Sequence, residues 1–357
     1  MTSYIWGFGL AFALSAGLTP WVRRYALARG IVDAPTTARK IHRREVAYLG
    51  GVAIFTAFVI CVLIFLPLTR QLAGLLLGCL ILVVVGVIDD VRDLSPGVKL
   101  AGQFVAAGVA LAGGIGITQI TNPFGGVIDL SWGRTAVHVL GWQFHVAPLA
   151  NALSLLWMVG LANTVNFLDG LDGLACGTSG IAALVMFGLA AGPHVHQPAV
   201  ALLAIILAGA AFGFLPYNFY PARIFMGDSG AYFLGLVLAM LAVYSGAKLA
   251  TAALVLGFPI VDALWAATRR LVKRTSPFRA DRKHFHHLLL DAGMTQPQAV
   301  LTLYGVAAIF GIVALSAGSF AKLVALIVLM FLMAASIGAL VFINWVRARK
   351  IYPKEPL

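Results

Sequence analysis

Acidic side chains in or beside apolar runs are the residues of this sequence best suited to chemistry. The chain has thirteen acids. Six of them occupy such positions: Asp89, Asp90, Asp169, Asp172, Asp228 and Asp262. Because a charged side chain near hydrocarbon costs about 2.5 to 3.5 kcal/mol even on the lenient insertion scale, these acids are expected to serve a function. Carboxylates bind hard cations, accept protons or hold polar substrates.

An adjacent pair of acids, Asp89 and Asp90, ends the apolar run VVVGVI at residues 83–88. Neighbouring side chains on a helix point about 100° apart, so the two carboxylates cannot aim at one atom unless the helix unwinds. We expect one of them to act as a base or metal ligand and the other to position a neighbour. A polar stop at the end of a helix is the simpler alternative.

A second polar segment, NTVNFLDGLDG, covers residues 163–173. Asn163 and Asn166 are three residues apart and share one face of a helix. Asp169 and Asp172 each precede a glycine, which permits a tight turn. These side chains suit a sugar, a ribose, a base or a hard cation. A plain turn that closes a helix is the alternative.

Asp228 lies between Gly227 and Ser229 in the segment PYNFYPARIFMGDSG at residues 216–230. Small neighbours on both sides would let this carboxylate approach a metal-bound phosphate without steric obstruction. Its simpler role would be to cap the helix that follows.

Three of the eight histidines, His284, His286 and His287, fall in the segment DRKHFHHLL at residues 281–289. His284 and His287 would share a helical face, whereas His284 and His286 would share one side of an extended segment. Imidazoles beside Arg282 suit a diphosphate. A zinc site is the competing interpretation, but no cysteine joins the histidines and their spacing matches no closed four-ligand pattern. A solvated basic loop is the simplest alternative.

Long apolar segments must position these side chains. Hydrophobic residues make up 61% and charged residues 11% of the 357 residues, and mean hydropathy is +0.95, whereas about a quarter of residues are charged in soluble domains. Apolar runs of about 18 to 25 residues can cross ~30 Å of hydrocarbon as helices. We predict an all-α polytopic membrane protein, a single domain over residues 1–357, with about eleven transmembrane helices: 3–22, 46–66, 71–88, 100–118, 147–163, 176–191, 198–217, 230–245, 249–267, 299–317 and 321–345.

The distribution of basic residues orients this predicted fold. With the N-terminus outside and the C-terminus in the cytoplasm, 21 of the 25 lysines and arginines fall on the cytoplasmic side, which satisfies the positive-inside rule. The net charge of +12 is therefore explained by the membrane orientation of the chain and not by nucleic-acid binding. The same basic residues would attract anionic lipid headgroups or phosphorylated ligands. All the motifs above fall in predicted cytoplasmic loops, so a single site is the economical explanation. These loops cover residues 23–45, 89–99, 163–175, 217–229 and 268–298, and the outer loop 119–146 is predicted to contain a hairpin.

Taken together, these segments resemble the polyprenyl-phosphate N-acetylhexosamine-1-phosphate transferase superfamily. The resemblance runs from RKIHRREVAYLGG at residues 39–51 to the histidine segment, with four motifs in the right order on one membrane side. The family implies an eleven-helix fold, a homodimer, and a bacterial inner-membrane location with the site facing the cytoplasm. It also implies Mg²⁺ dependence, with Mn²⁺ as the alternative ion, and transfer of a sugar 1-phosphate from a UDP-sugar to a polyprenyl phosphate, releasing UMP.

The resemblance also implies roles for individual residues. Asp89, Asp90 and Asp228 correspond to the catalytic set. Asp228 resembles the metal ligand, which Asp89 and Asn166 would assist, and Asp89 resembles the acid proposed to deprotonate the lipid phosphate or to act as nucleophile. The positions that match substrate-binding residues are Lys99, Asn163, Asn166, Asp169, Asp172, Arg282, His284, His286 and His287.

Within the superfamily, SPFRADRKHFHH at residues 276–287 resembles the N-acetylglucosamine branch, because Phe285 interrupts the three consecutive histidines usual in the muramoyl-pentapeptide branch. The implied reaction is transfer of N-acetylglucosamine 1-phosphate from UDP-N-acetylglucosamine to undecaprenyl phosphate, to start a cell-envelope glycan such as lipopolysaccharide or teichoic acid. The alternatives are a phospho-N-acetylmuramoyl-pentapeptide transferase or a member that uses another UDP-N-acetylhexosamine.

Two further classes of protein are alternatives. An organic-anion transporter also places acids in broken helices, but it predicts inverted halves, which are not found in the sequence, and leaves the histidines unexplained. An intramembrane aspartyl protease needs two carboxyl groups that share a proton near mid-membrane, whereas these acids are predicted at the inner edge among basic groups.

Overall fold

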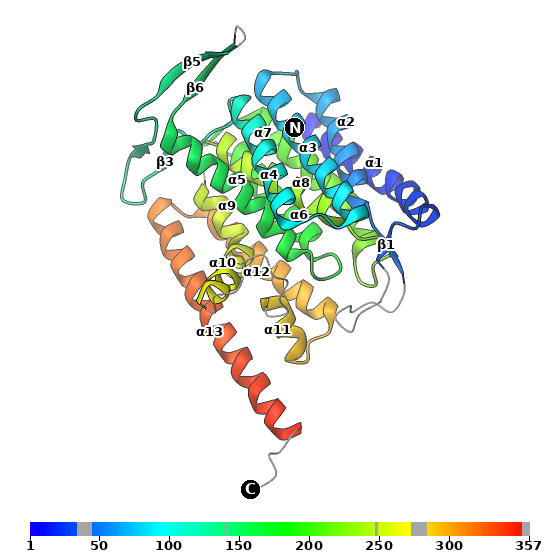
Figure 1. Ribbon diagram of the computed structural model, residues 1–357. Helices are drawn as coiled ribbons and strands as arrows, with labels where there is room; N and C mark the ends of the chain where they lie inside the picture. The colour runs from blue at the N-terminus through cyan, green and yellow to red at the C-terminus, as the bar shows by residue number, and fades with distance from the viewer. Residues whose placement is uncertain (34–44, 140–141, 194, 247–248, 273–283, 352–357) are drawn as a thin grey trace.

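The computed structural model describes residues 1–33, 45–139, 142–193, 195–246, 249–272 and 284–351, and most of this chain is helical (Figure 1). The helices are α1 (Thr2–Ala28), α2 (Gly50–Phe65), α3 (Arg70–Arg92), α4 (Pro96–Ala112), α5 (Pro148–Leu168), α6 (Leu174–Ala191), α7 (Pro198–Asn218), α8 (Gly227–Tyr244), α9 (Leu249–Val255), α10 (Gly257–Val272), α11 (Phe285–Asp291), α12 (Gln296–Ser316) and α13 (Ser319–Ile351). The strands are β1 (Val32–Asp33), β2 (Val46–Ala47), β3 (Gln119–Thr121), β4 (Val127–Asp129), β5 (Thr135–Val139) and β6 (Trp142–Val146).

The apolar helices make the chain a multi-pass membrane protein. Within the described ranges, eight helices are long and apolar enough to cross a membrane, or nine if the bent pair α9 and α10 is one span. Two more apolar helices, α2 with 16 residues and α4 with 17, are shorter than a full span. Ten of the eleven predicted runs overlap one helix each and the run 249–267 overlaps the bent pair, so eleven crossings stay a prediction.

Helices α7 and α8 form the centre of the bundle. Within the most apolar windows of these helices, 78% of α7 and 89% of α8 is buried, compared with 17% of α13. Helices α1 and α6 pack on α7, while α3 and α5 pack on α8. The site described below is built at one end of this buried core, because α8 begins there and α3 and α5 end there.

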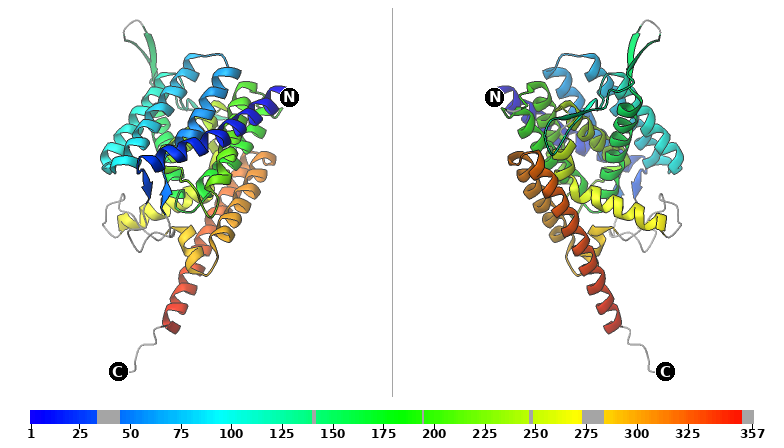
Figure 2. Two further views of the ribbon diagram at one scale, coloured as in Figure 1. Left: turned by 90° about the vertical axis from the view of Figure 1, so that its right-hand side faces the viewer. Right: turned by 90° about the vertical axis from the view of Figure 1, so that its left-hand side faces the viewer.

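The apolar run predicted as one helix over 249–267 is instead two helices, α9 and α10, which meet at an angle of 82°. Pro259 explains the break, since its ring would clash with the carbonyl of residue 255 in a continuous helix. At Gly257 a Cβ would lie 2.1 Å from Leu329 Cδ2 on α13, so the absence of a side chain lets the break pack closely against α13. The bend sends α10 across the end of the bundle that carries the site, as the yellow helix in Figure 2 shows.

Short strands lie at both ends of the bundle. The ribbon β1–β2 pairs Val32 with Ala47 near the end of α1, and Ala47 also bridges Ile224 in the segment between α7 and α8. At the opposite end, the segment predicted to contain one hairpin forms two, β3–β4 and β5–β6, and Figure 2 shows β5–β6 projecting beyond the helices. The N-terminus lies toward the β5–β6 end, whereas α13 runs past the other end of the bundle.

Candidate active site

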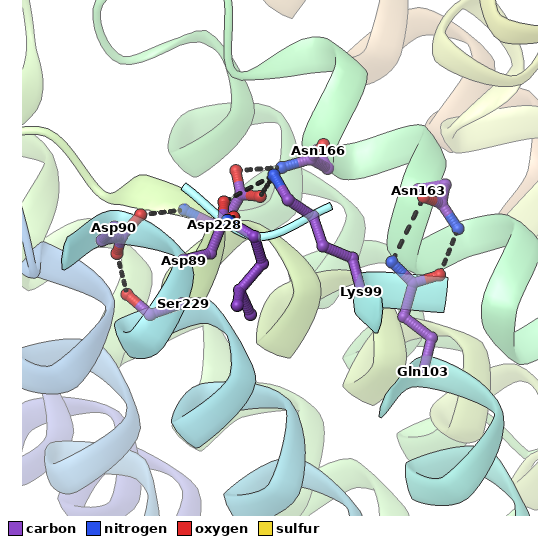
Figure 3. Close-up of polar contacts among 9 residues, drawn as sticks. Asp89, Asp90, Lys99, Gln103, Asn163, Asn166, Asp228 and Ser229 are labelled. Carbon is purple, nitrogen blue, oxygen red and sulfur yellow. Dashed lines mark hydrogen bonds and ion pairs between the residues drawn. The ribbon is translucent and has the colours of Figure 1, made fainter. Parts of the chain in front are cut away.

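Three acids from two helices converge at one end of the core (Figure 3). Asp89 and Asp90 lie in the last turn of α3, and Asp228 is the second residue of α8. We call these three residues the carboxylate cluster. Each offers an oxygen within 4.8 Å of those of the other two. The structure therefore gathers acids that are separated by about 140 residues of sequence.

Asp90 holds the start of α8. Its Oδ1 accepts a hydrogen bond from the backbone N–H of Asp228 at 2.9 Å, and its Oδ2 accepts one from the Ser229 hydroxyl at 2.9 Å. Gly227 has a φ of +72°, and a Cβ there would lie 2.4 Å from Asp90 Oδ2. Asp90 thus satisfies one of the free N–H groups at a helix N-terminus and fixes the position of the Asp228 carboxylate.

Lys99 bridges the other two carboxylates from the first turns of α4. Its ammonium lies 2.6 Å from Asp89 Oδ2 and 3.1 Å from Asp228 Oδ2 (Figure 3). The backbone N–H of Leu94 donates to Asp89 Oδ1 at 2.7 Å, and the Asn166 amide donates to Asp228 Oδ1 at 2.7 Å. The two adjacent acids of α3 therefore point in different directions without any unwinding of the helix.

Backbone contacts between helices fix this geometry. A Cβ on Gly86 of α3 would lie 2.3 Å from Ser229 Cα, and a Cβ on Gly51 of α2 would lie 2.1 Å from the backbone nitrogen of Gly230. Both contacts are with the backbone of the first turn of α8. Helices α2 and α3 can approach the start of α8 this closely only because both positions are glycine.

The predicted polar segment at the end of α5 contributes unequally to the cluster. Asn166 contacts Asp228 directly, but Asn163 lies one turn earlier and exchanges hydrogen bonds with Gln103 of α4, which is 2% exposed. Asp169 is half-buried after the helix end, and burial, followed by the charges of Asp228 and Asp90, raises its pKa well above the usual range. Asp169 is therefore held close to the carboxylate cluster.

Asp172 connects two loops at the end of the bundle that carries the carboxylate cluster, which we call the site end. Its Oδ2 accepts a hydrogen bond from the backbone N–H of Ala222 at 2.9 Å, in the segment that connects α7 to α8. In this arrangement Asp172 stabilises the loop that leads to Asp228.

The three predicted histidines come together beside the end of α5, and we call His284, His286 and His287 the histidine cluster. The rings of His284 and His286 are stacked, 5.7 Å apart and 6° from parallel, and the His286 and His287 rings are 4.4 Å apart. A Cβ on Gly170 would lie 2.5 Å from His286 Nε2. The histidine cluster therefore adjoins the segment whose Asn166 contacts Asp228.

The described histidines differ in their surroundings. His284 and His286 are 7% and 3% exposed. Burial, and then the neighbouring His287 and His284, holds the pKa of His286 well below its usual value. His284 Nδ1 lies 2.9 Å from Asp262 Oδ2. Arg282, also a candidate, lies outside the described residues.

Some residues of the site end were given no role from sequence. Gln103 lies inside an apolar run, where a buried amide must find a partner, and Ser229 was considered only as a small neighbour of Asp228. Asp262 stood out as an acid in an apolar run, but its partner was not identified. The signal in each case was a polar side chain inside a hydrophobic segment.

Comparisons with known proteins identify the family. Residues 72–246 match glycosyl transferase family 4. A probable undecaprenyl-phosphate N-acetylglucosaminyl 1-phosphate transferase of Bacillus subtilis (strain 168) is 34% identical over 84% of this chain and 80% of its own. A decaprenyl-phosphate N-acetylglucosaminephosphotransferase of Mycolicibacterium smegmatis (strain ATCC 700084 / mc(2)155) is 33% identical over 80% of this chain and 75% of its own.

A relative with a different named substrate also matches. A phospho-N-acetylmuramoyl-pentapeptide-transferase of Heliobacterium modesticaldum (strain ATCC 51547 / Ice1) is 29% identical over 85% of this chain and 94% of its own. The family match covers all three residues of the carboxylate cluster. The chain therefore belongs to glycosyl transferase family 4, among the polyprenyl-phosphate N-acetylhexosamine-1-phosphate transferases that its motifs resemble.

Proposed function

We propose that this protein transfers N-acetylglucosamine 1-phosphate from UDP-N-acetylglucosamine to undecaprenyl phosphate and releases UMP, to initiate a cell-envelope glycan. The observation that carries the proposal is the carboxylate cluster with Lys99 between two of its members, next to the histidine cluster. With a divalent cation on the carboxylates, the ion and Lys99 would offset the charge of two phosphates brought together here. Relatives named for N-acetylglucosamine transfer, at 34% and 33% identity, support this sugar over the muramoyl-pentapeptide.

The carboxylate cluster fits a hard divalent cation. Three carboxylates offer oxygens within 4.8 Å of one another, and oxygen is the ligand atom that Mg²⁺ and Mn²⁺ prefer. Lys99 already places a positive charge between Asp89 and Asp228, which indicates how strongly this position favours a cation. We propose that Asp228 holds Mg²⁺ with the help of Asp89 and Asn166, and the bound ion would neutralise phosphate charge and polarise the phosphoryl group.

The remaining residues have distinct proposed tasks. Asp89 would accept the proton of the lipid phosphate or attack the diphosphate itself, and Lys99 would hold a phosphate once a cation replaces it at Asp228. Asp90 would keep Asp228 in place through the start of α8. Asn163, Asp169, Asp172 and the histidine cluster would bind the nucleotide sugar, a division of work in which positioning supplies much of the rate.

The site end of the molecule is proposed to face the cytoplasm of a bacterial inner membrane. The excess of basic residues in the loops at that end supports this orientation through the positive-inside rule. The location of the N-terminus toward the β5–β6 end, and of the end of α13 at the opposite one, is consistent with it. A cytoplasmic site would also have access to UDP-sugars.

The test is UMP release by the detergent-purified protein with undecaprenyl phosphate and Mg²⁺. UDP-N-acetylglucosamine and UDP-N-acetylmuramoyl-pentapeptide are supplied separately, and each reaction is repeated with EDTA and with Mn²⁺. We expect turnover with the first substrate only, lost in EDTA and restored by Mg²⁺. Turnover with only the second substrate would support the proposed reaction type but contradict the proposed sugar. UMP from neither would contradict the proposed substrates. Another UDP-sugar would then be tested, followed by transport activity.

A further inference from the structure

Asp262 is a buried acid that the proposed reaction does not use. It lies in the second turn of α10, just after the 82° bend, and is 5% exposed. A buried carboxylate is costly unless it is fully hydrogen-bonded. Its partners therefore indicate what the residue is for.

Both oxygens of Asp262 are committed to the segment that begins α11. Oδ2 lies 2.9 Å from His284 Nδ1, and Oδ1 accepts a hydrogen bond from the backbone N–H of Phe285 at 2.9 Å. Phe285 is the first residue of α11, so its N–H has no partner within the helix. One side chain thus anchors the backbone and the ring of adjacent residues.

This geometry bears on which His284 nitrogen carries a proton. A carboxylate accepts hydrogen bonds and cannot donate when ionised, so His284 Nδ1 must carry a hydrogen to bond Oδ2. The second nitrogen, Nε2, is then the one available to a ligand. A carboxylate that fixes a histidine tautomer in this way is a recurring arrangement in functional sites.

Ring contacts extend the effect of Asp262 beyond His284. The His284 ring is nearly parallel to that of His286 and lies 5.8 Å from the Phe167 ring of α5. A rotation of His284 would disturb both contacts. The orientation of His284, and with it that of its stacked neighbour, therefore depends on the Asp262 bond.

We infer that Asp262 is a positioning residue, which fixes the Nδ1–H tautomer and the orientation of His284 so that Nε2 faces the diphosphate of the nucleotide-sugar substrate. The role toward substrate rests on the proposed function, whereas the tautomer does not. The bend between α9 and α10 contributes to this positioning, because it brings Asp262 to the site end of the bundle.

The first test reads the tautomer directly. ¹⁵N-histidine NMR of the purified protein distinguishes protonated from bare ring nitrogens, and the signal lost in His284→Gln assigns His284. We expect a protonated Nδ1 in the wild-type protein. A neutral ring with a bare Nδ1 and a protonated Nε2 would overturn the inference, whatever any variant does.

The variant Asp262→Asn then reverses the proposed bond. An amide has a single acceptor oxygen, which the Phe285 N–H requires, so the NH₂ group is left to donate to His284 Nδ1. We expect His284 to change to the Nε2–H tautomer. Asp291→Asn, the same substitution at an exposed acid of α11, should leave the spectrum unchanged. An unaltered His284 signal in folded Asp262→Asn would contradict the inference.

The kinetic arm measures UMP release under the conditions given above. Because partners that orient a functional histidine are typically worth roughly 10- to 100-fold in activity, we expect a fall of that size in Asp262→Asn, mainly in kcat/KM for the UDP-sugar. Wild-type kinetics in a variant with the altered tautomer would remove Asp262 from the reaction. If no UDP-sugar supports turnover in the wild type, the proposed function fails, while the NMR result still decides the tautomer.

Discussion

The carboxylate cluster and the histidine cluster adjoin each other at the end of α5, but they are held in place in different ways. The carboxylates lie at the ends of core helices whose backbones touch, because Gly51 and Gly86 let α2 and α3 reach the first turn of α8. The histidines lie at the start of a seven-residue helix, where the Asp262 side chain bonds to both a ring and a backbone N–H.

This difference indicates how each cluster should respond to substitution. The position of the carboxylate cluster depends on backbone contact among three helices, so substitution of the glycines that permit this contact should affect folding and chemistry together. A position fixed by one side chain can be altered while the surrounding fold stays intact. The predictions below test that distinction, beginning with the largest expected effect.

Asp228→Asn should reduce UMP release by at least about 10³-fold while the protein remains folded, since a neutral amide binds a hard cation and offsets phosphate charge less well. The amide still has an oxygen to accept the hydrogen bond from Asn166. Activity and the thermal unfolding midpoint are measured together, with Asp129→Asn at the opposite end of the bundle as control. Wild-type activity in a stable Asp228→Asn protein would remove this residue from the site.

Gly86→Ala should destabilise the fold by about 1 to 3 kcal/mol, because the new Cβ would lie 2.3 Å from Ser229 Cα and the backbone must move. We expect a lower unfolding midpoint and reduced activity in the same variant. Gly160→Ala is the matched control: it lies on α5, nothing is within 4 Å of its Cβ position, and alanine favours helix. Equal unfolding midpoints for the two variants would show that the close contact between Gly86 and the backbone of α8 does not contribute to the stability of the fold.

Lys99→Gln should lower the free energy of unfolding by about 2 kcal/mol in the absence of divalent cations, because Asp89 and Asp228 lose their shared ammonium. This value lies between those typical of exposed and buried ion pairs. Mg²⁺ should then raise the unfolding midpoint more in this variant than in the wild type, since no ammonium competes for the carboxylates. Lys322→Gln, at a lysine that bonds Thr251, serves as control. An identical Mg²⁺ shift in all three proteins would argue against a cation at the carboxylate cluster.

Much of the helical fold follows from properties that the sequence displays locally. Apolar run length placed ten of the eleven predicted runs on one helix each, with ends that differ by up to six residues from those observed, since a buried or lipid-facing helix needs a continuous apolar surface. Some ends required finer signals. Helix α12 begins at Gln296, three residues before the predicted start at 299, because Thr295 and Gln298 form a capping box.

The bend between α9 and α10 could not be read from the apolar pattern, because the run 249–267 is apolar on both sides of the break. Gly257 and Pro259 interrupt this run, and in the fold Gly257 packs against Leu329 of α13. The partner of Asp262 was also missed, since that bond exists only once α10 has turned across the bundle.

The carboxylate cluster was easier to predict than its division of labour. Acids in apolar runs are rare enough to stand out, and helical geometry required Asp89 and Asp90 to diverge. Which one would meet Asp228 depended on how α3 is rotated against α8. In the structure Asp90 accepts a hydrogen bond from the backbone of α8, and Asp89 forms an ion pair with Lys99.

The smallest effect we predict concerns stability at mildly acidic pH. Burial lowers the pKa of His286, so the folded protein keeps this ring neutral, while the unfolded chain takes up a proton below about pH 6.5. Stability should therefore fall as pH drops from 7 toward 5.5, by at most about 1.4 kcal/mol per unit from this residue. His286→Gln should flatten that slope in thermal unfolding, whereas His196→Gln, at an exposed histidine, should not. Equal slopes in all three proteins would mean that His286 is protonated equally in the folded and unfolded states, and that its burial does not exclude the charge.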